Sequence, residues 1–265
     1  MSLDRALLAA YLRQRAELGE RQVFLDGLDR LEAVRLLSAA RRPTTGGDPL
    51  SAISRELSAP APAPAPAPAP EVRERAPALD HARALKVLGD DASACVRCGL
   101  SRTRTQVVFG TGTAQAEVVV VGEAPGADED RTGVPFVGKA GRMLDLLLES
   151  VGFPRERVYI CNVLKCRPPG NRDPLPEEVA QCTPWLKRQI ELIQPRVLLA
   201  VGRFAAQSLT GTDAPMARLR GRVHAYEGVP VVATYHPAYL LRSPDQVRKC
   251  WDDLQLLRRV FDGPR

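Results

Sequence analysis

The sequence lacks any apolar run that approaches the about 20 residues of a membrane-spanning helix. Residues 1–13 mix acidic and basic side chains with leucine, which is typical of a helix and not of a secretory signal peptide. We therefore expect no membrane association and a location in the cytoplasm. Structural disulfides are rare there, so the six cysteines are available for metal ligation, redox chemistry or burial.

A large charge imbalance is also absent, since the formal net charge is only +6 over 265 residues. Most of this basic excess lies after residue 90. Such a surplus is compatible with nucleic-acid binding, but many unrelated enzymes share it. Charge alone therefore does not select a function.

An uninterrupted Ala-Pro repeat fills residues 59–70. Proline at alternate positions removes backbone donors and fixes φ, so the segment is expected to be an extended, semi-rigid spacer. Upstream, apolar residues recur at helical spacing in residues 3–40. The sequence thus predicts a helical N-terminal extension at 1–58, an Ala-Pro-rich linker at 59–80 and a main domain at 81–265. The extension is too small to have much of a hydrophobic core of its own, and a protein is the candidate binding partner for it.

Beyond residue 80, apolar strands alternate with amphipathic helices. The predicted strands are 117–122, 157–164, 196–202 and 229–234, and the predicted helices are 138–151, 175–193, 203–210 and 244–261. This alternation predicts a three-layer α/β/α fold around a central four-stranded parallel sheet. Ligands of such sheets bind beyond the carboxyl ends of the strands. Glu123, Asn162 and His236 all fall there.

Four cysteines have spacing typical of a metal site: Cys95-x2-Cys98, then Cys166 and Cys182. A close pair with two distant thiols indicates a centre built into a domain, and spacing alone does not distinguish tetrahedral zinc from a [4Fe–4S] cluster. Arg97, Arg102, Lys165 and Arg167 lie beside these thiols in the sequence and are candidates to offset their negative charge. Cys161 and Cys250 lie in an apolar strand and a helix, so we interpret them as core residues.

Three segments carry a resemblance to a known family: Gly122–Gly141 (GEAPGADEDRTGVPFVGKAG), Asn162–Arg172 (NVLKCRPPGNR) and Tyr235–Arg242 (YHPAYLLR). In this order, and with the four cysteines, they resemble the family 4 uracil-DNA glycosylases, the iron–sulfur branch of the uracil-DNA glycosylase superfamily. The resemblance covers about residues 90–261. It implies a [4Fe–4S] cluster on Cys95, Cys98, Cys166 and Cys182, with a structural role.

The resemblance implies a monofunctional hydrolase of base excision repair that flips deoxyuridine out of single- or double-stranded DNA and leaves an abasic site. It implies no lyase activity, because no lysine in the motifs is placed as a Schiff-base nucleophile. We further expect a monomer associated with the nucleoid. Two alternatives remain open: a non-catalytic nucleic-acid-binding accessory protein with a four-cysteine metal site, and a glycosylase of broader deaminated-base specificity.

The same resemblance assigns roles to the residues around the flipped uracil. The Asn162 amide would accept from uracil N3–H and donate to O4, a pattern that cytosine inverts; a strand-end asparagine otherwise caps turns. Phe136 would stack on the flipped ring, although a lone phenylalanine is commonly core. His236 would donate to uracil O2, where negative charge collects, and a neutral imidazole suffices. The alternative for this histidine is burial in the core.

The remaining assignments concern water, selectivity and DNA. Glu123 would organise the attacking water, with a backbone carbonyl as the alternative, because Ala124 stands where related enzymes have an aspartate; Ala124 itself is expected to contact the substrate. Glu129 would lie against uracil C5 and reject thymine. The residues after His236 would form a loop that contacts DNA and enters the base stack: Tyr239, Leu240, Leu241 and Arg242. Burial is an equally good interpretation of the two leucines.

Overall fold

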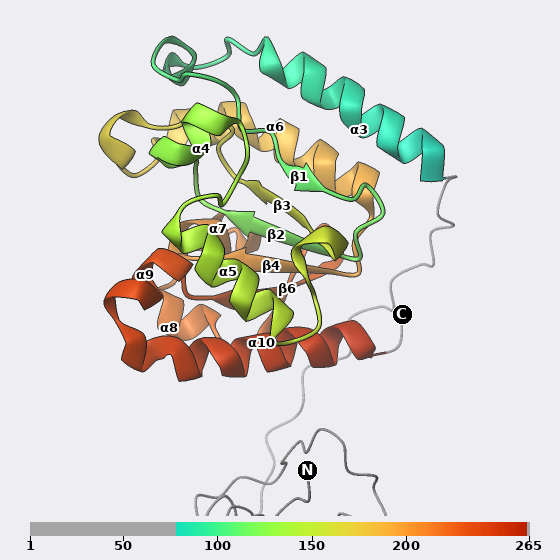
Figure 1. The fold of residues 1–265 in the computed structure, drawn as a ribbon, viewed down its shortest axis with the longest axis vertical. Helices are drawn as coiled ribbons and strands as arrows, with labels where there is room; N and C mark the ends of the chain where they lie inside the picture. Colours follow the sequence, from blue (N-terminus) through green and yellow to red (C-terminus); the bar gives the residue numbers. More distant parts are fainter. Residues whose placement is uncertain (1–77, 264–265) are drawn as a thin grey trace, which may run out of the picture. The chain divides into compact units, whose positions relative to one another are not determined.

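The computed structural model describes residues 78–263 (Figure 1). The predicted extension at 1–58 and the Ala-Pro repeat at 59–70 lie outside the described residues. The first described element, helix α3, begins at Ala78, three residues before the predicted start of the main domain.

A six-stranded sheet with the order β1-β3-β2-β4-β6-β5 forms the centre. The predicted four-stranded parallel sheet is present as its middle, because β3, β2, β4 and β6 pair in parallel. The total of four strands is wrong, since an antiparallel strand is added at each edge. The strands are β1 (Thr111–Gly112), β2 (Val118–Gly122), β3 (Tyr159–Asn162), β4 (Val197–Val201), β5 (Val223–Tyr226) and β6 (Val229–Thr234).

Turn chemistry explains the additional strand β5. It is joined to β6 by Glu227 and Gly228, whose φ angles are 48° and 83°. Positive φ at both central residues is the geometry of a tight hairpin whose twist matches the flanking strands. The other edge strand, β1, has only two residues, and its brevity left no alternating pattern to detect.

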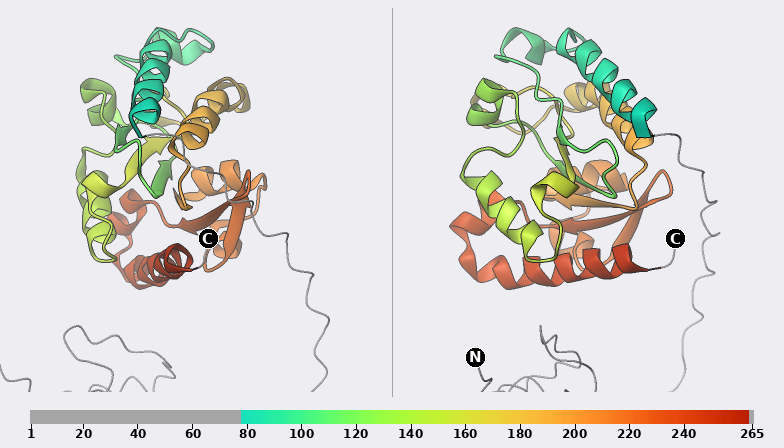
Figure 2. Two further views of the ribbon diagram at one scale, coloured as in Figure 1. Left: turned by 90° about the vertical axis from the view of Figure 1, so that its right-hand side faces the viewer. Right: turned by 45° about the vertical axis from the view of Figure 1, so that its right-hand side comes forward.

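Helices follow the central strands as predicted and lie on both faces of the sheet (Figures 1 and 2). The predicted final helix is divided into a 3-10 turn and α10, and the segment after His236 is a short helix, α9, instead of a loop. The α-helices are α3 (Ala78–Ser93), α4 (Ala127–Thr132), α5 (Lys139–Glu149), α6 (Pro176–Ile193), α7 (Arg203–Thr210), α8 (Met216–Leu219), α9 (Pro237–Arg242) and α10 (Val247–Asp262). The 3-10 turns are Gly99–Arg102, Arg155–Arg157, Pro169–Asn171 and Pro244–Gln246.

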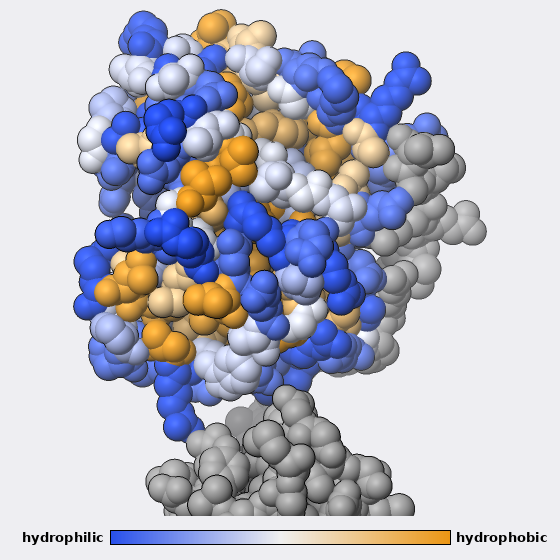
Figure 3. All heavy atoms as spheres, viewed as in Figure 1, coloured by the Kyte–Doolittle hydropathy of each residue, from blue (hydrophilic) through white to orange (hydrophobic). Residues whose placement is uncertain are grey.

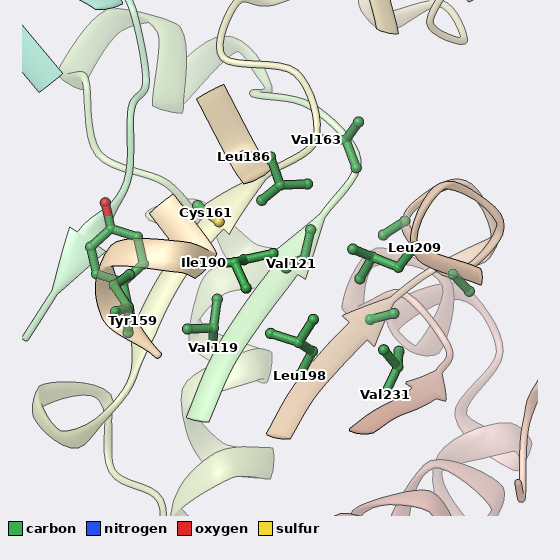
Figure 4. Packing of buried hydrophobic residues seen from close by; sticks show 14 of the residues in the cluster. Val119, Val121, Tyr159, Cys161, Val163, Leu186, Ile190, Leu198, Leu209 and Val231 are labelled. Atoms are coloured by element: carbon green, nitrogen blue, oxygen red, sulfur yellow. The ribbon is translucent and has the colours of Figure 1, made fainter. Parts of the chain in front are cut away.

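One face of the sheet packs against α6 and α7. Alternate residues of the strands, such as Val119 and Leu198, meet Leu186, Ile190 and Leu209 of these helices (Figure 4). All of these strand residues are fully buried, as expected for a parallel sheet covered on both sides.

The opposite face packs against α5 and α10. Val118 and Val120 of β2 pack with the apolar stripe of α5, which includes Leu144 and Leu148. Leu254 of α10 belongs to the same cluster. The two cores bury the central strands on both faces, and this packing determines where the carboxyl ends of the strands lie.

The surface of this domain is mixed in character. Hydrophobic residues form separate groups among hydrophilic ones on the face shown in Figure 3. Among residues 78–263, no helix is both long and apolar enough to span a bilayer.

Candidate functional site

The carboxyl ends of the parallel strands bring three predicted residues to one edge of the sheet. Gly122, the last residue of β2, pairs with Asn162, the last residue of β3. Glu123 follows β2 directly, and His236 comes two residues after β6. Because open parallel sheets bind ligands beyond the carboxyl ends of their strands, we take this end of the sheet as the candidate functional site.

Asn162 holds a buried amide against Gly122. The residue is 2% exposed, and its side-chain oxygen Oδ1 has no hydrogen-bond partner within the described part of the chain. A Cβ on Gly122 would overlap that oxygen and lie 2.6 Å from Cζ of Phe136, so glycine is required for both side chains to fit. Leaving a buried acceptor unpaired costs about 1–3 kcal/mol. A ligand that donates to Oδ1 would remove this cost.

The Phe136 ring lies at the same glycine and faces His236. The two ring centroids are 5.7 Å apart, and the planes are tilted by 31°. Phe136 has a φ of 54°, in the left-handed region that bulky residues rarely adopt. Gly141 permits this conformation, because a Cβ there would overlap the Phe136 carbonyl oxygen. The structure thus brings together three residues predicted to surround the base, and their contacts with a base stay predictions.

Arg155 fixes the loop that carries Phe136. Its guanidinium donates to the carbonyl oxygens of Pro135 at 2.6 Å and Phe136 at 3.2 Å. The same group forms an ion pair with Asp145 of α5 at 2.8 Å. The sequence had not indicated this residue, which lies outside the recognised motifs.

The carboxylate of Glu129 binds the other side of that loop. Its Oε1 accepts hydrogen bonds from the backbone N–H groups of Val137 at 3.0 Å and Gly138 at 3.2 Å. It is also close enough to His236 to influence its pKa. Glu129 therefore supports the Phe136 loop, and its predicted contact with uracil C5 stays a prediction.

His236 is held as a neutral imidazole with a defined tautomer. Its Nδ1 accepts from the Ala238 N–H at 3.2 Å, which leaves the ring proton on Nε2. Burial, assisted by the positive charge of Arg242, lowers the pKa of His236 to about 4, against an opposing effect of Glu129. The ring is consequently neutral at pH 7 and has an Nε2–H donor.

Glu123 is half-buried at the end of β2. Burial raises the pKa of its carboxyl group, and the negative charge of Asp173 raises it further. Arg203, which forms an ion pair with Asp173 at 3.2 Å, acts in the opposite direction. A carboxylate that is less well solvated than usual is a stronger base, which suits a residue that positions water.

Helix α9 presents only part of the predicted DNA-contacting set. Leu240 is 1% exposed and packs into the core, so its assignment to a DNA contact is wrong. Leu241 is 44% exposed and Tyr239 is 37% exposed, and Arg242 is exposed as well. A helix turns successive side chains by about 100°, which explains why neighbouring leucines have opposite surroundings.

The four predicted cysteines line one cavity of about 20 Å³. Cys95 and Cys98 are partly exposed, while Cys166 and Cys182 are buried. Among residues 78–263, no three His, Cys, Asp or Glu side chains are grouped so that they could hold one metal ion.

Hydrogen-bond donors surround these sulfurs. Arg104 donates to Cys166 Sγ at 3.3 Å, and the backbone N–H of Lys165 donates to Cys182 Sγ at 3.2 Å. Trp185 also lines the cavity, and its buried Nε1 has no partner within the described residues. Burial raises the pKa of Cys166 and raises that of Cys182 to about 11, whereas the adjacent Arg104 and Lys165 lower them. Such donors and charges favour electron-rich sulfur.

Of the four cations predicted beside the thiols, Arg97 and Lys165 line the cavity. Arg97 stacks on the Trp185 ring, with its guanidinium carbon 4.4 Å from the ring centroid. Arg104 had not been predicted, because no motif marks it; its six-residue distance from Cys98 is the only signal in the sequence.

Ala124 connects the two sites. It is partly buried and packs against the apolar residues around the cysteines, immediately after Glu123. Its predicted contact with substrate stays a prediction. Cys161 and Cys250 are fully buried, in agreement with their interpretation as core residues.

Comparison with known proteins decides the family. The model of the uracil DNA glycosylase superfamily matches residues 109–255. The chain belongs to this superfamily. The matched range contains Glu123, Asn162 and His236, together with Cys166 and Cys182.

Individual relatives are similar over most of their own length. The chain is 50% identical to the type-4 uracil-DNA glycosylase of Archaeoglobus fulgidus over 158 residues, which are 57% of this chain and 79% of the relative. It is 45% identical to that of Thermotoga maritima over 161 residues, 60% of this chain and 84% of the relative. It is 36% identical to that of Sulfurisphaera tokodaii over 191 residues, 69% of this chain and 87% of the relative.

Proposed function

We propose that this protein is a uracil-DNA glycosylase, which hydrolyses the N-glycosidic bond of deoxyuridine in DNA and leaves an abasic site for base excision repair. The observation that carries the proposal is the buried, unpartnered Oδ1 of Asn162, placed beside the rings of Phe136 and His236. Similarity to type-4 uracil-DNA glycosylases supports the same conclusion.

Recognition would depend on the amide of Asn162. Uracil offers the N3–H donor that Oδ1 lacks, and its O4 accepts from the amide NH₂. Cytosine offers an acceptor at N3 and a donor at N4, so it would leave both amide groups unpaired, a strong penalty in a buried site. Phe136 supplies an apolar ring for stacking on the extruded base.

Hydrolysis would use His236 and Glu123 on opposite sides of the breaking bond. As the bond between C1′ and N1 lengthens, the sugar becomes oxocarbenium-like and the base leaves as an anion. The Nε2–H of His236 would donate to O2 of that anion and stabilise the transition state more than the ground state. Glu123 would orient the water whose oxygen bonds to C1′, with a backbone carbonyl as the alternative, and the proton that this water loses would neutralise the departing uracil anion, directly or through the carboxylate.

The lysine of the second motif supports hydrolysis without lyase chemistry. The ammonium of Lys165 is buried and donates to the Asn162 carbonyl and to Gln189, so it is not free to attack a sugar carbon. A Schiff base requires an accessible amine.

The exposed part of α9 is the proposed contact with DNA. Leu241 would enter the stack at the position of the flipped base, while Tyr239 and Arg242 would meet the backbone. We expect action on single- and double-stranded DNA by a monomer, in the cytoplasm at the nucleoid. We retain the division into a helical extension (1–58), a linker (59–80) and a glycosylase domain (81–265), with a protein partner for the extension.

For the cysteine site we propose a [4Fe–4S] cluster held by Cys95, Cys98, Cys166 and Cys182. The observation that supports the proposal is that all four cysteines line one cavity, together with Arg104 and Lys165. The donors of Arg104 and Trp185 suit the electron-rich sulfur of such a centre. When bound, it would join the 95–102 arm to α6 and so support the DNA-facing surface.

Release of free uracil tests the function directly. The purified full-length protein should liberate uracil from single- and double-stranded oligonucleotides that contain one deoxyuridine, and the product should remain uncleaved until it is treated with alkali. DNA binding without base release would favour the non-catalytic alternative. Comparable release of hypoxanthine from a deoxyinosine substrate would favour the broader glycosylase.

A further inference from the structure

Lys165 is a buried cation between the two sites. The residue is 2% exposed, and within residues 78–263 no carboxylate forms an ion pair with it. Burying a charge without a counter-charge is costly, so a lysine in such a place needs compensation from its surroundings.

The polar groups of Lys165 join three parts of the molecule. Its Nζ donates to the backbone carbonyl of Asn162 at 2.7 Å and to Oε1 of Gln189 on α6 at 2.5 Å. Its backbone N–H donates to Cys182 Sγ at 3.2 Å, and its carbonyl accepts from the Val108 N–H at 2.8 Å. One residue therefore contacts the strand end that carries the amide, a predicted cluster ligand and the segment that follows the first cysteine pair.

Gln189 holds the ammonium in place. Its amide oxygen accepts from Lys165, while its Nε2 donates to the Phe109 carbonyl at 2.9 Å and to the Tyr159 hydroxyl at 3.0 Å. Both of its amide groups are thus used, and Gln189 is fully buried. The Phe109 ring, whose centroid is 5.8 Å from Nζ, adds a cation–π contact, but neither this ring nor Gln189 carries a negative charge.

A cluster held by the four cysteines would supply the missing negative charge. Lys165 precedes Cys166, lines the same cavity as the four cysteines, and its backbone N–H lies 3.2 Å from Cys182 Sγ. Thiolates that ligate iron are anionic, and hydrogen bonds and charges around a cluster stabilise it. On this account the cluster and the buried lysine stabilise each other.

We propose that Lys165 is a positioning residue that couples the cysteine site to base recognition: its charge stabilises the thiolate-ligated cluster, and its ammonium supports the strand end on which the Asn162 amide is mounted. This inference rests on the proposed function and on the proposed cluster. It predicts that loss of one lysine, which touches neither base nor iron, weakens both uracil binding and iron retention.

Three substitutions separate charge from hydrogen bonding. Lys165→Met removes both, Lys165→Gln keeps a donor without the charge, and Lys165→Arg keeps the charge. Lys187→Met is the matched control, because Lys187 lies on α6 with an exposed ammonium paired to Glu227. Each full-length protein is purified anaerobically and assayed for iron per chain during a chelator challenge, inhibition by free uracil and binding to abasic-site DNA.

We expect Lys165→Met to lose iron and to bind free uracil about 10-fold to 100-fold more weakly than the parent protein, the usual range for residues that support metal ligands. Abasic-DNA binding should weaken less than uracil binding, because phosphate contacts dominate it and the proposed DNA contacts of α9 lie outside the hydrogen bonds of Lys165. Lys165→Arg should retain iron better than Lys165→Gln. If Lys165→Met does not fold, the comparison of Lys165→Arg with Lys165→Gln still tests whether the charge of the lysine stabilises the cluster.

Unchanged iron retention and unchanged uracil inhibition in Lys165→Met or Lys165→Gln would overturn the inference. Selective loss of one property would refute the coupling. If the parent protein releases no uracil, the proposed function fails instead, and if it binds no iron, the proposed cluster fails. Each failure therefore has its own signature.

Discussion

At the scale of single residues, the amide of Asn162 combines three properties: it is buried, its oxygen lacks a donor, and glycine is required beside it. Together these properties describe a binding group that is incomplete without its ligand. Core packing alone gives no reason to bury an unpaired amide oxygen, because an apolar side chain would avoid the cost.

Asn162→Ala should lower the single-turnover rate of uracil release roughly 100-fold to 1000-fold, since two hydrogen bonds to the base are lost. Binding to abasic-site DNA should remain nearly unchanged. Gln115→Ala, which removes an exposed amide in a turn, serves as the control and should leave the rate unaltered. A normal rate in Asn162→Ala would remove this residue from recognition.

Glu123 and His236 should give the reaction a defined pH dependence. The pKa of Glu123 is raised by burial, so its active carboxylate forms, and the rate rises, as the pH increases through that pKa. His236 is neutral above its pKa of about 4. In Glu123→Gln, the pH below which the rate of uracil release falls should therefore shift down to about 4, and the maximal rate should be lower than in the parent protein. Rate profiles of the same shape for both proteins would exclude Glu123 as the titrating group.

Residues at strand ends were predictable from the sequence, and residues that support them were not. Asn162 and His236 lie at or just after the ends of apolar strands within recognisable motifs, so their positions could be predicted from the sequence. Arg155 and Arg104 act on segments that are distant in the sequence, and only the folded chain shows which carbonyl or sulfur each one meets. The burial of an individual side chain also cannot be predicted from the sequence, as Leu240 shows.

At the scale of elements, helix α9 offers a matched pair of leucines. Leu241→Ala should leave stability within about 0.5 kcal/mol of the parent and lower the rate on duplex substrate about tenfold, with a smaller effect on single strands, because only a duplex stack needs a wedge. Leu240→Ala should destabilise the fold by about 2–5 kcal/mol through a cavity. Chemical denaturation and paired rate assays measure both effects. Equal rate losses on the two substrates would contradict the wedge.

The four parallel strands were predictable because full burial makes them continuous apolar runs, each followed by an amphipathic helix. The edge strands were not. β5 is exposed on one side, only partly buried on the other and contains His224, and β1 is two residues long, so neither shows a clear strand pattern. Their pairing depends on the neighbouring strand, which is a long-range property in the case of β1 and β3.

At the scale of the whole molecule, metal content distinguishes the two centres that the cysteine spacing permits. Anaerobic preparation should give about four irons per chain with a broad visible absorbance, and Cys182→Ala should lose both. Because the proposed cluster would join the 95–102 arm to α6, its loss should also lower the melting temperature. Stoichiometric zinc with no iron would overturn the cluster assignment.

Removal of residues 1–77 should leave uracil release intact, because the superfamily match begins at residue 109 and the described domain begins at α3. The kinetic constants of the truncated and full-length proteins on the same oligonucleotide provide the comparison. A marked loss of activity on short substrates would show that the extension takes part in catalysis, whereas a loss of protein interactions alone would support its role as a tether.

The loop that carries Phe136 has one more consequence. Arg155 and Glu129 hold its backbone from two sides, in a left-handed conformation that a free chain seldom visits. The loss of conformational entropy in this loop occurs when the protein folds, not when a base arrives. Capture of an extrahelical base then requires little further ordering of the protein. The temperature dependence of uracil binding should accordingly reflect stacking and dehydration of the base rather than loop closure.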